Sequence, residues 1–101
     1  MSTNSIILEF IWDKGNSDKN FLKHNVTNKE TEDVFFDRNC KTFNDIIHSI
    51  NETRYRIIGK TEQNRILLVV YTIRGNMIRV ISARDTNKKE IKLYEKKANT
   101  S

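Results

Sequence analysis

The stretch Tyr71-Thr-Ile-Arg-Gly-Asn-Met-Ile-Arg-Val-Ile-Ser-Ala-Arg84 decides the expected fold. Two apolar runs flank the Gly75-Asn76 pair, a pattern typical of the two-residue turn in a β-hairpin. Arg74, Arg79 and Arg84 stand in or beside these runs, where a charge needs water, an acid or a ligand. Because a guanidinium matches two phosphate oxygens at once, the hairpin is predicted to form part of a site for an anionic ligand.

The length of the turn sets which side chains of the hairpin share a face. With a two-residue turn, Thr72, Arg74 and Arg79 lie together on one face of the sheet. A three-residue loop would instead separate Thr72 from Arg79.

The rest of the chain predicts an α+β fold in which helices pack on an antiparallel sheet. The run from Ile66 to Tyr71 has no polar alternation, so it should be buried on both faces. The expected order is β-α-α-β-β-β-α, with strands at Ile6–Trp12, Arg54–Lys60, Arg65–Ile73 and Met77–Ala83, and helices at Asp13–His24, 28–36 and Lys88–Lys97.

Capping residues and polar stretches mark the expected boundaries. Asp13 is the expected N-cap of the first helix, and Asn25 its left-handed end. Thr27 and Asn87 each precede a glutamate by three residues, as capping residues do. The polar stretch 37–45 is expected to be a loop, and 46–51 fits either a loop or the start of a strand.

Charge is distributed unevenly along the 101 residues, which are expected to form a single domain, 1–101, with its core at 5–97. Residues 1–51 contain 6 Lys and Arg against 8 Asp and Glu, whereas residues 52–101 contain 12 against 5. This asymmetry favours a polyanionic partner for the second half, with RNA the leading candidate. The alternative is a protein with a basic tail that binds no polyanion.

Several classes of protein are poorly supported by composition. Cys40 is the single cysteine, which argues against a disulfide framework and fits a cytoplasmic location. The apolar runs are too short to span a membrane, and the first residues do not resemble a signal peptide. Two distant histidines do not suggest a metal site, and there is no glycine-rich phosphate loop, so neither a metal nor a cofactor is expected.

The candidate residues suit RNA cleavage without a metal. That reaction needs a base for the 2′-hydroxyl proton, donors for the phosphate and an acid for the leaving oxygen. Glu52 or His48 could serve as base or acid, while Arg54, Arg79 and Arg84 could stabilise the phosphate. The alternative is that these strand arginines form salt bridges with groups such as Glu52. Trp12 fits a core position as well as a base-stacking platform.

Blocks of residues in a specific order resemble a known family. Trp12-Asp13, Asn20 and Lys23–Val26 form the first block, His48–Arg54 with Ile58-Gly59 the second, and Arg65, Val69–Gly75 and Ile78–Arg84 the third, followed by Glu90 and Tyr94. These blocks resemble the BrnT toxins of type II toxin–antitoxin modules, and the resemblance extends from Glu9 to Glu95. Asn16 departs from the pattern, since the family usually carries lysine there.

The resemblance implies a compact RelE-like ribonuclease fold. Together with the candidate residues, it predicts an endoribonuclease toxin that cleaves RNA without a metal. It also implies a BrnA-like antitoxin that neutralises the toxin in a hetero-oligomer and represses the operon. The alternative is a non-catalytic RNA- or protein-binding module on the same fold. The expected catalytic residues are Glu52, Arg54, Arg79 and His48, and the expected RNA-binding residues are Lys23, His24, Arg65, Arg74, Arg84 and Trp12.

Overall fold

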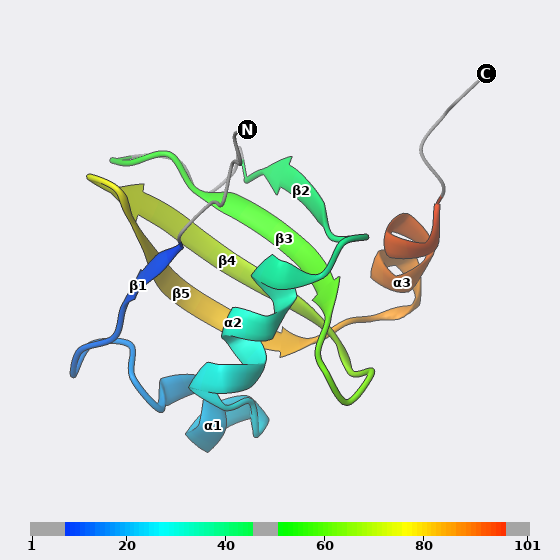
Figure 1. Ribbon diagram of the computed structural model, residues 1–101, viewed down its shortest axis with the longest axis horizontal. Coiled ribbons are helices and arrows are strands. Elements are labelled where there is room, and N and C mark those ends of the chain that lie inside the picture. The colour runs from blue at the N-terminus through cyan, green and yellow to red at the C-terminus, as the bar shows by residue number, and fades with distance from the viewer. Residues whose placement is uncertain (1–7, 46–50, 97–101) are drawn as a thin grey trace, which may run out of the picture.

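The computed structural model describes residues 8–45 and 51–96, which form a mixed α+β fold. Within these ranges five strands make one sheet, and helices pack against it (Figure 1). The elements are β1 (Glu9–Ile11), α1 (Lys19–His24), α2 (Asn28–Phe36), β2 (Lys41–Asn44), β3 (Tyr55–Lys60), β4 (Ile66–Arg74), β5 (Met77–Asp85) and α3 (Lys88–Glu95).

The sheet has the strand order β1-β5-β4-β3-β2. Strands β2 to β5 pair antiparallel, but β1 pairs parallel with β5, with Glu9 opposite Met77 and Ile11 opposite Arg79. The expectation of an antiparallel sheet is therefore wrong at this edge. The direction of β1 depends on a partner near the other end of the chain, which no local pattern reports.

Strand β2 lies in a stretch that the sequence predicted to be a loop, so the expected element order lacks one strand. It pairs with β3, with Lys41 opposite Ile58 and Asn44 opposite Tyr55. Phe43 is its one apolar residue, and this polar composition hid a strand that exists because β3 offers a free edge. Residues 46–50, whose sequence fits either a loop or the start of a strand, lie outside the described residues.

The first helix begins later than predicted, and Asp13 is not its N-cap. Residues 14–18 form turns, and α1 begins after Asp18, which has a φ of 59° and makes no side-chain capping hydrogen bond. The other predicted capping residues are confirmed. Asn25 ends α1 in the left-handed conformation, and Thr27 and Asn87 each form a complete capping box.

The β4–β5 hairpin has the two-residue turn that the sequence predicted. Gly75 has a φ of +62°, a conformation that favours glycine, and Thr72 lies opposite Arg79. Further along, a bulge shifts the register, because Tyr71 lies opposite Val80 whereas Val70 lies opposite Ser82. Ile81 is the extra residue in β5, and the side chains after it lie on the face opposite to the one that strict alternation predicts. Arg84 therefore lies on the same face of the sheet as Arg79.

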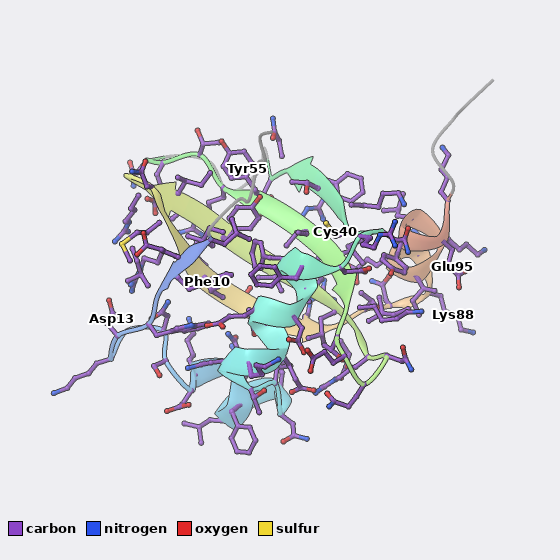
Figure 2. All side chains as sticks on the ribbon, viewed as in Figure 1. Phe10, Asp13, Cys40, Tyr55, Lys88 and Glu95 are labelled. Atoms are coloured by element: carbon purple, nitrogen blue, oxygen red, sulfur yellow. The ribbon has the colours of Figure 1, made fainter. Side chains whose placement is uncertain are left out.

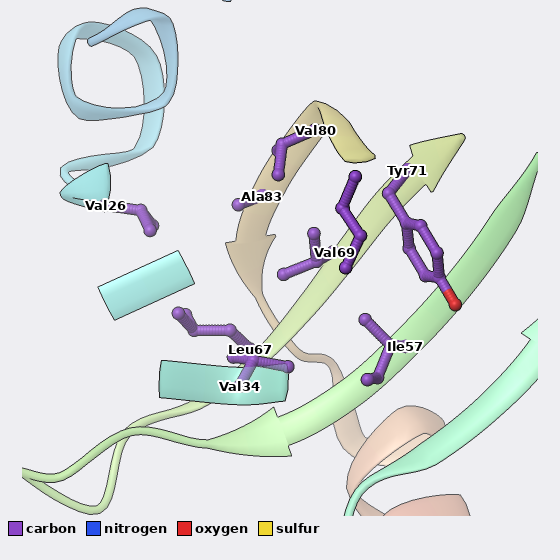
Figure 3. Close-up of a cluster of buried hydrophobic side chains, with 9 residues drawn as sticks. Val26, Val34, Ile57, Leu67, Val69, Tyr71, Val80 and Ala83 are labelled. Carbon is purple, nitrogen blue, oxygen red and sulfur yellow. The ribbon is translucent and has the colours of Figure 1, made fainter. Parts of the chain in front are cut away.

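The main core lies between the sheet and the helices α1 and α2 (Figure 3). Its fully buried side chains include Val34 of α2 and Leu67, Val69 and Val80 of the sheet. Helix α2 approaches closely at Gly59, where a Cβ would lie 2.7 Å from the Val34 carbonyl oxygen. This close approach explains why glycine stands in the middle of that interface.

The opposite face of the sheet is only partly covered. A smaller cluster joins Tyr94 of α3 to Ile58 and Leu68, with Phe43 and Ile66 beside it. In Figure 1, α3 lies at one end of the sheet rather than across its middle. The remainder of this face, which we call the open face, carries Arg54, Arg56, Thr72, Arg74, Arg79, Ser82 and Arg84.

Candidate functional site

Four of the predicted site residues meet at one end of the open face. Glu52, Arg54, Arg74 and Arg79 line a depression of about 200 Å³. The same depression is lined by Gly15 and Asn16 from the loop after β1, by Lys19 at the start of α1, and by the bulge residue Ile81. The site therefore combines one carboxylate with four cationic side chains.

Arg79 is held by Asp13, the residue that the sequence predicts as a helix cap. Its Nη1 donates to Asp13 Oδ2 at 2.6 Å, and its Nη2 donates to Asp13 Oδ1 at 3.2 Å. Because Arg79 donates these bonds, the pKa of Asp13 is lowered and that of Arg79 is raised. The side chain of Arg79 is 18% exposed. Its guanidinium lies at the rim of the depression, where the two hydrogen bonds to Asp13 orient it.

The loop that carries Glu52 and Arg54 is fixed to the sheet by a threonine. Thr72 is buried, and its hydroxyl donates to the carbonyl oxygen of Thr53 at 2.8 Å. Glu52 Oε1 lies 3.5 Å from Arg74 Nη2, the outer limit of a hydrogen bond. The carboxylate of Glu52 is therefore placed by its backbone and remains 34% exposed at the depression.

Beyond the end of β1, the side chains of two buried asparagines form hydrogen bonds with the backbone at the edge of β5. Asn16 Nδ2 donates to the carbonyl oxygens of Ile11 and Val80, at 2.8 and 3.0 Å. Asn20 Oδ1 accepts from the amide of Ala83 at 3.0 Å. These side chains satisfy backbone groups that a neighbouring strand would otherwise pair. Asn16 therefore ties the loop after β1 to the bulge beside the depression.

Arg84 and Arg65 lie outside the depression and are engaged in ion pairs. Arg84 makes a two-pronged contact with Glu90 at 2.9 and 2.8 Å, which joins β5 to α3. Arg65 donates to both carboxylate oxygens of Asp85 and to the carbonyl oxygens of His24 and Asn25. These contacts give both arginines a structural role, and their contact with RNA stays a prediction.

The remaining predicted residues are spread over other parts of the molecule. The indole of Trp12 donates to Glu32 at 2.6 Å and its ring packs against the main core, away from the open face. Lys23 is exposed and His24 half-buried in the last turn of α1. His48 lies outside the described residues. The structure thus groups Glu52 with three arginines and leaves Trp12, Lys23 and His24 apart from them.

Sequence reasoning missed Asp13, Asn16 and Lys19 as members of the site. Asp13 and Asn16 occupy a stretch that looked helical, so their side chains were not expected near β5. One signal was available, because an arginine in an apolar strand predicts an acid close by. Nothing in the local pattern identified which acid, since Asp13 reaches Arg79 only through the parallel pairing of β1 with β5.

The arrangement can hold a phosphate and move a proton. Arginine donors at the rim match a phosphate diester, and the partly exposed carboxylate of Glu52 can accept a proton from a bound hydroxyl. Among residues 8–45 and 51–96, no three His, Cys, Asp or Glu side chains are grouped so that they could hold a metal ion. In the same ranges, no helix is long and apolar enough to cross a membrane.

Comparison with known proteins places the chain in a family. A comparison with curated proteins gives no match. A profile of the family described as "Ribonuclease toxin, BrnT, of type II toxin-antitoxin system" matches residues 12–90, most of the chain. The matched segment contains the depression and every residue that orients its charged groups. The chain therefore belongs to the BrnT family of ribonuclease toxins of type II toxin–antitoxin systems.

Proposed function

We propose that this chain is a metal-independent endoribonuclease of RelE type, and that the depression around Glu52 and Arg79 is its active site. The observation that supports this most is the meeting of one partly exposed carboxylate with Arg54, Arg74 and Arg79. These are the groups that RNA cleavage requires when arginines supply the positive charge.

The reaction is an internal attack on the phosphodiester. Glu52 takes the proton of the 2′-hydroxyl, and the 2′-oxygen forms a bond to phosphorus as the bond to the 5′-oxygen breaks. Arg79, Arg54 and Arg74 hold the non-bridging oxygens, whose negative charge grows in the transition state. A proton donor completes the departure of the 5′-oxygen, and His48 is our candidate for this step. The products are a 2′,3′-cyclic phosphate and a 5′-hydroxyl.

Asp13 is the other carboxylate beside Arg79, but its contacts favour a positioning role. Two guanidinium donors and the amide of Gly15 bind its oxygens, which lowers the pKa of Asp13 and makes it a weaker base. Among the described residues, the hydrogen bond that Glu52 accepts is the long one from Arg74. The assignment of Glu52 as base and Asp13 as the residue that orients Arg79 follows from this difference.

A cognate antitoxin of the BrnA type neutralises the enzyme in this proposal, and the basic open face is its expected docking surface. The complex would form in the cytoplasm, where the RNA substrate is. An acidic partner surface over the depression would occupy the arginines that hold phosphate. Copurification of the chain with the product of the neighbouring gene tests this part directly, and two folded proteins that fail to associate would refute it.

The central experiment measures cleavage of a single-stranded RNA by the purified chain in EDTA. Native protein should cleave and leave 2′,3′-cyclic phosphate ends, and Glu52→Gln should lower the rate by about 10²–10⁴-fold, the usual contribution of a general base. Glu62→Gln is the matched control, because the side chain of Glu62 is 72% exposed and lies outside the depression. Cleavage that EDTA abolishes and one divalent ion restores would replace the proposal with a metal mechanism. RNA binding without cleavage would favour a binding module.

A further inference from the structure

A second basic depression lies at the other end of the sheet, beside α3. It has a volume of about 590 Å³, and its cationic residues are Arg38, Lys41, Lys60 and Lys96. Glu95 is the one acid that lines it. In Figure 2, Cys40 and Glu95 mark this side of the molecule, whereas Asp13 marks the side of the candidate active site. We call this depression the distal pocket.

Tyr94 orders two of the lysines at the wall of the distal pocket. The ammonium groups of Lys41 and Lys60 lie 5.7 and 5.9 Å from the centre of the Tyr94 ring. Lys41 also donates to the carbonyl oxygen of Tyr94 at 3.1 Å, and the Tyr94 hydroxyl donates to Asp37 at 2.6 Å. These contacts hold the two ammonium groups in place. Among the described residues neither lysine forms an ion pair, although the charge of Lys60 acts on the nearby carboxylate of Asp37.

The other two cations of the distal pocket are available to a ligand. Arg38 and Lys96 are exposed, and within the described part of the chain neither has an ion-pair partner. Four cations against one acid give the pocket a positive potential, which attracts a polyanion.

The distal pocket and the candidate active site lie on the same face of the sheet. Even-numbered residues at β3 lie on one face of the sheet, which places Arg54, Arg56, Ile58 and Lys60 on the same side. Lys41 lies on that side too, because it is paired with Ile58. From Arg54 to Lys60 the strand advances ~20 Å, at about 3.3 Å per residue. A single strand of nucleic acid that leaves the active site along β3 would therefore reach the pocket.

Arg56 stands between the two sites and has an unsatisfied donor. Its Nε is buried and, among the described residues, lacks a hydrogen-bond partner. A buried donor of a charged group without a partner is costly, so its presence points to an acceptor that binds there. A phosphate that passes from one site to the other would supply that acceptor. An acidic protein segment confined to the distal pocket would leave Arg56 unsatisfied.

We propose that the distal pocket binds the phosphate backbone of the RNA substrate, away from the cleaved bond, and that Arg56 contacts the strand between the two sites. The proposal rests on the proposed function, because it assumes that RNA occupies the open face. It adds a second contact region that lengthens the recognised strand. If the proposal is correct, the affinity of the protein for RNA increases with the length of the RNA, and the salt dependence of that affinity becomes steeper with length as well.

The test uses Arg38→Ala/Lys96→Ala with Lys88→Ala/Lys89→Ala as the control. Both double variants remove two exposed cations, but Lys88 and Lys89 line neither pocket. The probes are 2′-O-methyl RNA strands, which cannot be cleaved by attack of the 2′-oxygen. A short strand covers the candidate active site, and a long strand reaches ~20 Å further.

Native chain and control should bind the long strand more tightly than the short one. Arg38→Ala/Lys96→Ala should lose that gain, and its log–log salt slope on the long strand should fall by about 1.4, or about 0.7 for each lost contact. Equal slopes for the two double variants would overturn the proposal. So would native affinity that is the same for both strands, or loss of antitoxin binding with RNA binding intact.

The experiments distinguish a failure of the distal pocket from a failure of the proposed ribonuclease activity. Cleavage of short RNA by native chain reports on the active site alone, whereas the gain with length reports on the distal pocket. A chain that cleaves short RNA but gains nothing from the longer strand refutes the distal pocket and leaves the ribonuclease standing. A chain that gains with length and cleaves nothing supports the pocket and refutes the enzyme.

Discussion

Asp13 and Arg79 are far apart in the chain, yet the Oδ2 of Asp13 lies 2.6 Å from the Nη1 of Arg79. The contact forms because Ile11 pairs with Arg79 at the end of β1, so the chain that leaves this strand passes beside the guanidinium. Arginine in a strand is thereby given one orientation rather than several. A fixed guanidinium loses little further freedom when it binds a phosphate.

Replacement of Arg79 by alanine should remove activity while leaving the fold intact. Loss of one donor to the developing phosphate charge typically lowers a rate by about 10²–10³-fold. The surface pair with Asp13 contributes little to stability, because Asp13 is half exposed. Cleavage rate and thermal unfolding of Arg79→Ala should be measured together. Unchanged cleavage would exclude the catalytic role, and a collapsed thermal transition would make Arg79 structural.

Replacement of Gly15 by alanine should disturb the site rather than the fold. The added Cβ would lie 2.9 Å from Nη2 of Arg79 and 3.2 Å from Oδ1 of Asp13. Since Gly15 is exposed, we expect slower cleavage and an unchanged melting temperature. Gly59→Ala is the counterpart, because its Cβ would meet the backbone of Val34 at 2.7 Å. It should cost about 1–3 kcal/mol in the free energy of unfolding. A stability loss for Gly15→Ala as large as that of Gly59→Ala would contradict this division.

Replacement of Asn20 by alanine should destabilise the protein more than the loss of a polar side chain at the surface would. The change leaves the amide of Ala83 buried without an acceptor, which costs about 1–3 kcal/mol in the free energy of unfolding. Asn44→Ala, at an exposed position of β2, is the control. Urea unfolding of both variants measures the difference. Equal stabilities would show that the buried asparagine does not support β5.

The contact between Arg84 and Glu90 predicts a pH dependence of stability. Arg84 lowers the pKa of Glu90 below its ordinary value of 4.5, so the charged form favours the folded state. The stabilisation is complete above pH 4.5 and is lost as the pH falls through the folded-state pKa. Glu90→Gln keeps a side chain suited to the capping box while removing the charge.

The difference in the free energy of unfolding between native protein and Glu90→Gln should therefore be about 1 kcal/mol at neutral pH, because Arg84 is partly exposed and solvent weakens the pair. The difference should disappear in acid. Urea unfolding at several pH values measures it. A difference that persists well below pH 4 would rule out the ion pair as its source.

The parts of the fold that local chemistry determines were predictable from sequence. The turn at Gly75-Asn76 and the capping boxes at Thr27 and Asn87 depend on neighbouring residues, and all are confirmed. Helix α2 has the predicted bounds, and three strands lie within two residues of theirs. Local propensity and tertiary structure agree in these elements.

The parts that distant contacts determine were not predictable. Strand β2 has one apolar residue and exists because β3 has a free edge, and β1 takes its direction from β5. The bulge opposite Val70 and Tyr71 moves Arg84 onto the open face, which simple alternation did not anticipate. For the site, the pattern identified Glu52, Arg54, Arg74 and Arg79. The partner of Arg79 required the three-dimensional structure, because turns rather than a helix follow Asp13.

The amide side chains of Asn16 and Asn20 have a consequence for how this molecule meets copies of itself. They occupy backbone groups of β5 that an incoming strand would need. In the described part of the chain, the two outermost strands are β1 with three residues and β2 with four. Proteins limit the growth of sheets between molecules by keeping edge strands short and by covering their free backbone groups. These features oppose the growth of a sheet between copies of the free chain, although its strands are rich in β-branched residues.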